Sequence, residues 1–268
     1  MTRQAAPQPR FETALPGAVV VQEVCQQSTL PLYLQPEWAD RFPWLIQATT
    51  GRGGNGEFDL SFFTQTPVAQ LLERWQALRD DARLGSVALA RQVHGARIIS
   101  HRQPGQGIMI HDAADGHVSA IADLTLAVSV ADCVPISLID TDARVVALLH
   151  AGWRGIAAGI LELGLEELQS RGSRSLNHVY CHLGPAICGS CYEVGPEVHQ
   201  ALGLARPPEN TPVDLRALLA ARALAMGVPQ GHVSISSFCT RCHADLFFSH
   251  RAGHSGRQMG LLGVRSAW

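Results

Sequence analysis

The chain contains no lysine, since all 21 of its basic residues are arginine. Enzymes that form a Schiff base with their substrate, P-loop nucleotide-binding proteins and protein kinases each depend on a lysine amine, so these classes are excluded. An anionic ligand must therefore be held by arginine side chains, by backbone N–H groups or by a metal ion.

Long hydrophobic runs are also lacking, because no segment reaches the ~18 apolar residues that a membrane span needs. The polar start of the chain has no apolar signal-peptide core, and we expect residues 1–17 to form a flexible arm. The net charge of -2 offers no basic surface to nucleic acid or to a membrane. Seven cysteines are an odd number, which without a signal peptide favours a reducing, cytoplasmic location.

The hydrophobic pattern predicts a mixture of strands and helices. A strand over residues 124–130 alternates apolar with small or polar residues, so we expect one of its faces in the core. Residues 135–139 and 144–150 flank a turn signal and predict an antiparallel hairpin. Helices are expected over residues 68–83 and 155–170, and from Thr211, as N-cap, to about residue 226. This mixture favours the α+β class over a doubly wound parallel sheet, in a single catalytic domain over residues 18–268.

Three short motifs each place a metal-capable side chain at the end of an apolar run. They are QVHG (residues 92–95), ADC (131–133) and HAGWRG (150–155), which carry His94, Cys133 and His150. Two imidazoles and one thiolate suit zinc or copper, and not calcium or magnesium. The hairpin brings Cys133 and His150 to the same open end, whereas His94 must come from a neighbouring strand end. Three protein ligands with a fourth position open are typical of a catalytic metal.

A metal-free site can be built from the same side chains. In this alternative, Cys133 is a nucleophile and His94 or His150 is its base. The residues alone leave both interpretations open.

The third motif leads into the predicted helix and suggests an anion site. Gly152 allows a ligand to approach the backbone, and Trp153 and Arg154 follow it. We expect Arg154 and the free N–H groups to bind phosphate beside the metal. An ordinary helix start with Arg154 in solvent is the alternative.

Three further arginines are candidates for the site. Arg52 lies in a glycine-rich loop, GRGG (residues 51–54), which a simple turn explains equally well. Arg251 and Arg257 follow the aromatic segment 247–248 and are candidates for substrate contact.

Two C-x-x-C pairs, Cys188 with Cys191 and Cys239 with Cys242, are separated by roughly fifty residues. The usual gap between the pairs of a four-cysteine zinc site is ~15–20 residues, so small buried thiols are the favoured interpretation. A second, structural zinc is the alternative, which His243 beside Cys242 supports.

Together, these motifs closely resemble one family, long labelled polyphenol-oxidase or laccase-domain proteins and later understood as purine nucleoside phosphorylases. The resemblance runs from about residue 45 to the C-terminus. It rests on the segments 92–95, 131–133, 150–155, 184–194, 239–240, 248–251 and 256–257.

The resemblance implies a zinc site formed by His94, Cys133 and His150, with copper as the other candidate metal. It implies phosphorolysis of adenosine, inosine and methylthioadenosine to a free base and a ribose 1-phosphate, with an adenosine deaminase side activity. It also implies a compact, layered α+β fold of mixed sheet with flanking helices, related to a deamidating-toxin domain with a Cys-His site. Cys133, His94 and Arg52 are then the catalytic candidates, and Gly152, Trp153, Arg154, Arg251 and Arg257 the substrate-binding ones.

The sequence departs from the family pattern in two places. The family commonly reads Thr-Thr-Arg-x-Gly-Gly, whereas Arg52 stands one position later. Its usual Ser-Leu-Asn-Leu is replaced by DLSF at residues 59–62.

The laccase label itself conflicts with the histidine pattern. A multicopper oxidase needs many histidine ligands, mostly in His-x-His pairs, and none of the 12 histidines forms such a pair. A true laccase is therefore rejected. Besides the phosphorylase acting on purine nucleosides and phosphate, two functions stay open: a thiol amidohydrolase using Cys133 and His94, and a non-enzymatic regulator that binds nucleotides.

Overall fold

The computed structural model describes residues 16–26, 30–53 and 58–266. The expected flexible arm, residues 1–17, falls mostly outside these ranges, so its separation from a single catalytic domain over residues 18–268 stays a prediction. Within the described ranges, no helix combines the length and the apolar character that crossing a membrane requires.

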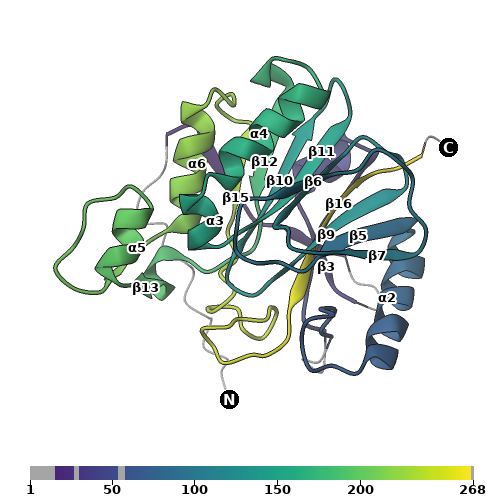
Figure 1. Cartoon of the computed structure of the whole chain (residues 1–268), viewed down its shortest axis with the longest axis horizontal. Coiled ribbons are helices and arrows are strands. Elements are labelled where there is room, and N and C mark those ends of the chain that lie inside the picture. Colours follow the sequence, from purple (N-terminus) through teal and green to yellow (C-terminus); the bar gives the residue numbers. More distant parts are fainter. Residues whose placement is uncertain (1–15, 27–29, 54–57, 267–268) are drawn as a thin grey trace.

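Two seven-stranded sheets make up most of the fold (Figure 1). The first has the order β1-β15-β12-β10-β11-β8-β6 and mixes parallel with antiparallel neighbours. Its strands are β1 (Ala18–Val21), β6 (Ile98–Ser100), β8 (Gly116–Ser119), β10 (Val134–Asp140), β11 (Val145–Ala151), β12 (Val179–Leu183) and β15 (Val233–Ser236).

The second sheet has the order β2-β3-β4-β16-β9-β5-β7 and is also mixed. Its strands are β2 (Val24–Gln26), β3 (Leu32–Leu34), β4 (Leu45–Thr50), β5 (Ser86–Ala90), β7 (Ile108–His111), β9 (Leu124–Val130) and β16 (Gln258–Val264). A separate two-stranded pair is formed by β13 (Glu193–Val194) and β14 (Thr211–Pro212).

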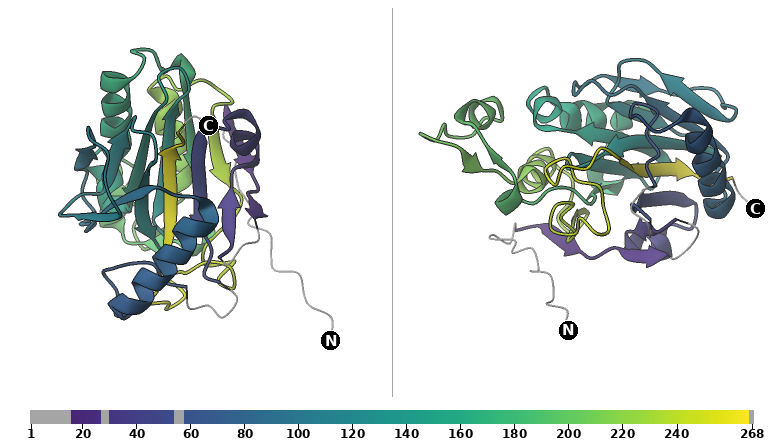
Figure 2. Two further views of the ribbon diagram at one scale, coloured as in Figure 1. Left: turned by 90° about the vertical axis from the view of Figure 1, so that its right-hand side faces the viewer. Right: turned by 90° about the horizontal axis from the view of Figure 1, so that it is seen from below.

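The two sheets pack face to face, and helices cover their outer faces (Figure 2). Apolar side chains of β9 and β16 meet those of β10 and β11 in the middle layer. Helices α4 and α6 cover the first sheet and α2 covers the second. The helices are α1 (Pro36–Arg41), α2 (Val68–Ala82), α3 (Trp153–Ala157), α4 (Ile160–Arg171), α5 (Pro196–Ala201) and α6 (Leu215–Ala225). The predicted layered α+β class is confirmed, whereas the relation to a deamidating toxin stays a prediction.

Strand β9 is buried on both faces, so the expectation of one core face was wrong. Leu126 and Val128 face the first sheet, whereas Ala127 packs on the other side in the cluster that contains Trp75 of α2. The side chains on the second face are small, which allows α2 to pack closely there. In the sequence, the alternation of large apolar with small or polar residues therefore resembled that of a strand with one face in solvent.

The predicted long helix over residues 155–170 is two helices. Helix α3 ends before Gly159, which adopts a left-handed conformation with φ of 81°, and α4 begins at Ile160. Glycine tolerates this conformation, so the chain turns there while the apolar rows continue on both sides. Hydrophobic periodicity could not reveal the break.

The last helix also begins later than predicted. Thr211 is not the N-cap, because it lies in β14 and pairs with Val194. Asp214 is the N-cap, and its side chain accepts hydrogen bonds from the backbone N–H groups of Arg216 and Ala217. A carboxylate at this position satisfies two helix donors at once.

Candidate metal centre and its cavity

His94 and Cys133 both lie where the chain crosses from the second sheet to the first. Residues 91–97 connect β5 to β6, and residues 131–133 connect β9 to β10. His150 stands at the end of β11, directly opposite Pro135 in the β10–β11 hairpin. Both crossovers occur at the same end of the sheets, and the open end of the β10–β11 hairpin lies there too. The side chains of His94, Cys133 and His150 therefore meet at this end.

The three potential ligands lie close together. One ligand atom each from His94, Cys133 and His150 falls within 4.8 Å of the others. The two imidazole rings are nearly perpendicular, at 79°, with their centroids 4.9 Å apart. His150 is buried, Cys133 is half-buried and His94 is exposed, so the cluster opens to solvent on the His94 side.

Gly152 packs directly against this cluster. A Cβ atom at this position would lie 3.0 Å from Cδ2 of His94 and 3.1 Å from Sγ of Cys133. Such contacts are tighter than side chains normally accept, so the absence of a side chain at Gly152 allows the two ligands to approach each other.

Asp115, directly before β8, orients His150. One carboxylate oxygen lies 2.9 Å from Nδ1 of His150, and both side chains are buried. The backbone N–H of His150 also donates to the carbonyl of Asp115, at 2.7 Å. An imidazole held at Nδ1 by a carboxylate presents Nε2 as the ligand atom.

The same carboxylate shapes the loop that carries His94. It accepts hydrogen bonds from the backbone N–H groups of Val93, His94 and Gly95, at 3.2, 2.9 and 2.7 Å. These contacts hold His94 in a left-handed conformation with φ of 58°. Sequence reasoning missed Asp115, because an Asp directly followed by Gly ahead of a short strand indicates only a turn.

Gln92 anchors the other side of this loop. Its amide oxygen accepts from the backbone N–H of Ser129 on β9, at 2.7 Å, and its amide nitrogen donates to the carbonyl of Ser129, at 2.8 Å. The glutamine of the QVHG motif therefore fixes the loop to the second sheet, while Asp115 fixes it to the first.

Charge coupling favours ionised forms in the cluster. Burial opposes the thiolate of Cys133, yet His150 and His94 outweigh it and lower the Cys133 pKa to about 6. Burial likewise opposes the imidazolium of His150, yet Cys133 and Asp115 raise the His150 pKa to about 9. Hydrogen bonds from His150 and Gly95 lower the pKa of Asp115 in spite of its burial. A thiolate is the form of cysteine that binds a metal or attacks a substrate.

The cluster opens into a cavity of about 530 Å³. This volume lies in the range of sites for small organic ligands. The lining combines the three potential ligands with aromatic rings and arginines. Besides the cluster and Gly152, it includes Ser61, Phe63, Thr64, Arg91, Gln92, Ser129, Trp153, Arg154, Tyr192, His250, Arg251 and Arg257.

Trp153 and Arg154 reach the cavity as a pair. The Arg154 guanidinium lies over the Trp153 ring, with its central carbon 4.2 Å from the ring centroid. Helix α3 is only five residues long, so its N-terminus offers a weak dipole compared with that of a long helix. The Arg154 side chain is therefore a better candidate for anion contact than the helix start.

Arg251 is tied to the Cys133 motif through Asp132. The Asp132 carboxylate accepts from the backbone N–H of Arg251, at 2.7 Å, and from the hydroxyl of Thr240, at 2.6 Å. The Arg251 guanidinium lies over the Tyr192 ring, 5.0 Å from its centroid. Asp132 thus connects the Cys133 crossover to the loop between β15 and β16, residues 237–257, which we call the C-terminal loop.

Arg257 lines the cavity, but part of its guanidinium already has partners. Its Nη1 donates to the carbonyls of Ser255 and Gly256, at 2.9 and 2.8 Å. Its backbone N–H donates to the carboxylate of Asp59, at 3.0 Å, in the segment where the sequence departs from the family pattern.

Arg52 is not among the residues that line the cavity. Its guanidinium donates to the carbonyl of Ala244 and lies over the ring of Phe248, 5.4 Å from the centroid. Its backbone N–H donates to Leu246, at 2.8 Å, which holds the loop against the 244–248 segment. The structure therefore does not bring Arg52 together with Cys133 and His94.

Comparisons with known proteins place these observations in context. The model of a family described as multi-copper polyphenol oxidoreductase laccase matches residues 49–265. A protein named Purine nucleoside phosphorylase YlmD, from Geobacillus stearothermophilus, is 35% identical over 216 residues, which are 74% of each chain. Adenosine deaminase RL5, from an unknown prokaryotic organism, is 35% identical over 193 residues, 65% of this chain and 73% of that protein. The crystal structure of YlmD from G. stearothermophilus superposes with a TM-score of 0.83 at 27% identity, over 91% of this chain and 100% of that chain.

Proposed function

The chain belongs to the multi-copper polyphenol oxidoreductase laccase family, and we propose that it is a zinc-dependent purine nucleoside phosphorylase. The proposed reaction converts adenosine, inosine or methylthioadenosine and phosphate into the free base and a ribose 1-phosphate. Adenosine deamination is proposed as a side activity, in line with the name of the RL5 relative. Both reactions are proposed to occur in the cytoplasm.

One observation carries the proposal: the two imidazoles and the thiolate open into a cavity that several arginines line. A purine nucleoside combines a flat aromatic base with a polar sugar, and phosphate needs positive charge, which arginine must supply because the chain has no lysine. The cavity provides aromatic rings and arginine side chains in one place.

The residues fit a zinc ion. His94, Cys133 and His150 supply two nitrogens and one sulfur within 4.8 Å, and Asp115 holds the buried imidazole by its other nitrogen. Three such ligands with an open position are typical of catalytic zinc. A blue-copper site has the same two histidines and cysteine with a weak axial ligand, and methionine, the usual one, is not among the described residues that line this cavity. When bound, zinc supplies positive charge that can polarise a phosphate or acidify a water molecule.

The arginines are proposed to hold phosphate for attack on the sugar. Arg154 and Arg251 reach the cavity from two sides, on α3 and on the C-terminal loop. A phosphate oxygen forms a bond to the anomeric carbon, the bond from that carbon to the purine nitrogen breaks, and its electron pair leaves with the base. Fixed positive charge close to the attacking phosphate orients it and stabilises the transition state.

The base is proposed to lie on the aromatic side of the cavity. Trp153 and Tyr192 both line it, and each carries an arginine on one ring face. Phe248 is 3% exposed and is not among the lining residues, so it is not a candidate for stacking. His250, which also lines the cavity, is the side chain proposed to supply the proton that the departing purine takes up.

A second candidate is a thiol amidohydrolase, which the lowered Cys133 pKa favours. A thiolate beside an imidazolium is the arrangement of a cysteine nucleophile. Metal content separates the two functions. Activity that persists in chelator and is abolished by iodoacetamide supports the amidohydrolase.

The test incubates protein of known zinc content with inosine, with and without phosphate, and identifies the products by chromatography. We expect hypoxanthine and ribose 1-phosphate only when phosphate is present. Cys133→Ala is expected to lose both the zinc bound by His94, Cys133 and His150 and the activity. Cys25→Ser, at an exposed position on β2, is expected to keep both. Absence of phosphate-dependent inosine loss at any protein concentration contradicts the proposal and favours a non-enzymatic nucleotide-binding protein.

A further inference from the structure

The two C-x-x-C pairs converge on one point in spite of their separation in sequence. Strands β12 and β15 pair in parallel, so the segments that follow them leave the sheet at the same end. The pairing continues beyond the strands, where Ala186 forms a bridge with Cys239. The sheet therefore closes the long sequence gap, so the spacing between the pairs does not prevent the four cysteines from meeting.

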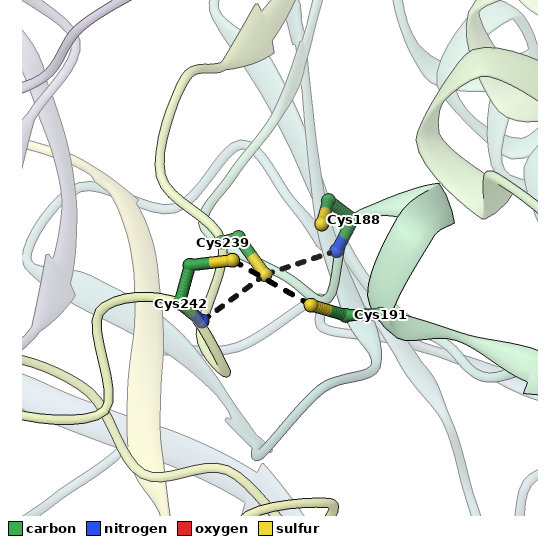
Figure 3. Close-up of side chains that lie close together, drawn as sticks. All are labelled: Cys188, Cys191, Cys239 and Cys242. Carbon is green, nitrogen blue, oxygen red and sulfur yellow. Dashed lines mark hydrogen bonds between the residues drawn. The ribbon is translucent and has the colours of Figure 1, made fainter. Parts of the chain in front are cut away.

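The four sulfurs have the spacing of a metal site. All of them lie within 4.8 Å of one another, and those of Cys191 and Cys242 are 3.5 Å apart (Figure 3). Four thiolates around one zinc ion, at about 2.3 Å from the metal, stand about 3.8 Å from each other. A disulfide needs sulfurs at about 2.05 Å, so these side chains are arranged around a common centre and not as bonded pairs.

Backbone groups support negative charge on the buried sulfur. Sγ of Cys239 accepts hydrogen bonds from the N–H groups of Cys188 and Cys242, at 3.2 and 3.4 Å. Cys188 and Cys239 are buried, and Cys191 and Cys242 close the cluster on its outer side. His243 does not join the cluster, because its Nδ1 contacts the backbone of Cys239.

We propose that Cys188, Cys191, Cys239 and Cys242 bind one structural zinc ion, separate from the His94–Cys133–His150 cluster. Closed tetrahedral sites with four cysteines are structural, since no position stays open for a substrate. The zinc joins two loops that form a wall of the cavity. Tyr192 directly follows Cys191, and His250 and Arg251 follow Cys242 along the C-terminal loop.

The decisive test counts zinc in a variant that lacks the other site. The His94→Ala/Cys133→Ala double variant keeps Cys188, Cys191, Cys239 and Cys242. Its zinc content therefore tests the four-cysteine site without any substitution in that site that could prevent folding. Elemental analysis of this variant, purified with reductant, is expected to give about one zinc ion per chain. After exchange for cobalt, it is expected to show intense sulfur-to-cobalt charge-transfer bands and the visible spectrum of a tetrahedral four-thiolate site.

One substitution within the four-cysteine site and a matched control complete the experiment. In the same double-variant background, Cys191→Ser is expected to lose the zinc and to melt at least about 5 °C lower. Cys25→Ser makes the same substitution at an exposed cysteine outside both clusters, and it keeps zinc and melting temperature. A zinc-free double variant, or one in which mass spectrometry finds Cys191 joined to Cys242 as a disulfide, overturns the proposal. None of these measurements uses enzymatic activity, so they succeed or fail independently of the proposed phosphorylase function.

Discussion

The carboxylate of Asp115 contacts His150 at Nδ1 and, at the same time, holds the loop that carries His94 through three backbone N–H groups. The side chain is completely buried. One acidic group thus fixes the positions of two of the three potential metal ligands. It also sets the orientation of the buried imidazole, because a carboxylate at Nδ1 leaves Nε2 free to bind metal.

Replacing Asp115 by Asn is therefore expected to weaken the metal site. The amide keeps the volume of the carboxylate but loses its charge, so His150 becomes a poorer ligand and the His94 loop loses a strong acceptor. Loss of such a supporting carboxylate typically costs about 10–100-fold in metal affinity. The change is measured by competition for zinc with a chelator of known affinity.

Asp112→Asn is the matched control for this variant. Asp112 lies three residues earlier, its side chain is 77% exposed, and it pairs with Arg91 at the surface. Surface ion pairs contribute little to stability, so zinc affinity should stay within about twofold of the unchanged protein. Equal zinc affinities of the two variants contradict the role assigned to Asp115.

A methyl group at Gly152 is expected to separate the ligands. Its Cβ would lie within 3.0–3.1 Å of both His94 and Cys133, so one of them must move. We expect Gly152→Ala to bind zinc at least about tenfold more weakly, equivalent to about 1.4 kcal/mol. Gly95→Ala is the control beside the site, since its Cβ would meet Asp115 and Val93 at ordinary distances of 3.6 and 3.7 Å. Unchanged affinity in Gly152→Ala, measured by the same competition, refutes the steric argument.

Much of the fold follows from local patterns in the sequence. Turn residues and flanking strands predicted the β10–β11 hairpin, and its register places His150 opposite Pro135, next to Cys133. The break at Gly159 escaped prediction because the apolar rows continue on either side of it. Short elements such as α1 and β8 are too brief for periodicity to reveal.

Long-range contacts mark the limit of sequence reasoning at the site. His94 reaches Cys133 only because both crossovers lie at the same end of two packed sheets, and no local pattern encodes which sheet a strand joins. Asp115 escaped notice for the same reason, since 35 residues separate it from His150. Arg52 was expected at the site, yet its loop is held by the 244–248 segment instead.

Removing the Arg154 guanidinium is expected to weaken phosphate binding. The side chain lies at the cavity over Trp153, and a charge-assisted contact to phosphate is lost in Arg154→Ala. We expect the KM for phosphate to rise roughly tenfold, with a smaller change in the KM for inosine. Arg171→Ala, at the end of α4 beside Glu167, is the control and leaves both values unchanged. An unchanged phosphate requirement and affinity in Arg154→Ala removes this residue from the proposed anion site.

The reactivity of Cys133 in metal-free protein should report its lowered pKa. The pKa is about 6, so the thiolate predominates at neutral pH and disappears only as the pH falls through that value. An ordinary thiol, with a pKa of about 8.5, gains reactivity at much higher pH. The rate of iodoacetamide labelling at Cys133, followed by peptide mass spectrometry, should therefore reach its plateau near pH 7. In His94→Ala, which removes one of the groups that favour the thiolate, the midpoint should move to higher pH.

Added zinc should protect Cys133 at every pH above the midpoint, because the metal occupies the sulfur. A midpoint near 8.5 in the unchanged protein would show that His150 and His94 do not stabilise the thiolate, which would also remove the main support for the amidohydrolase alternative.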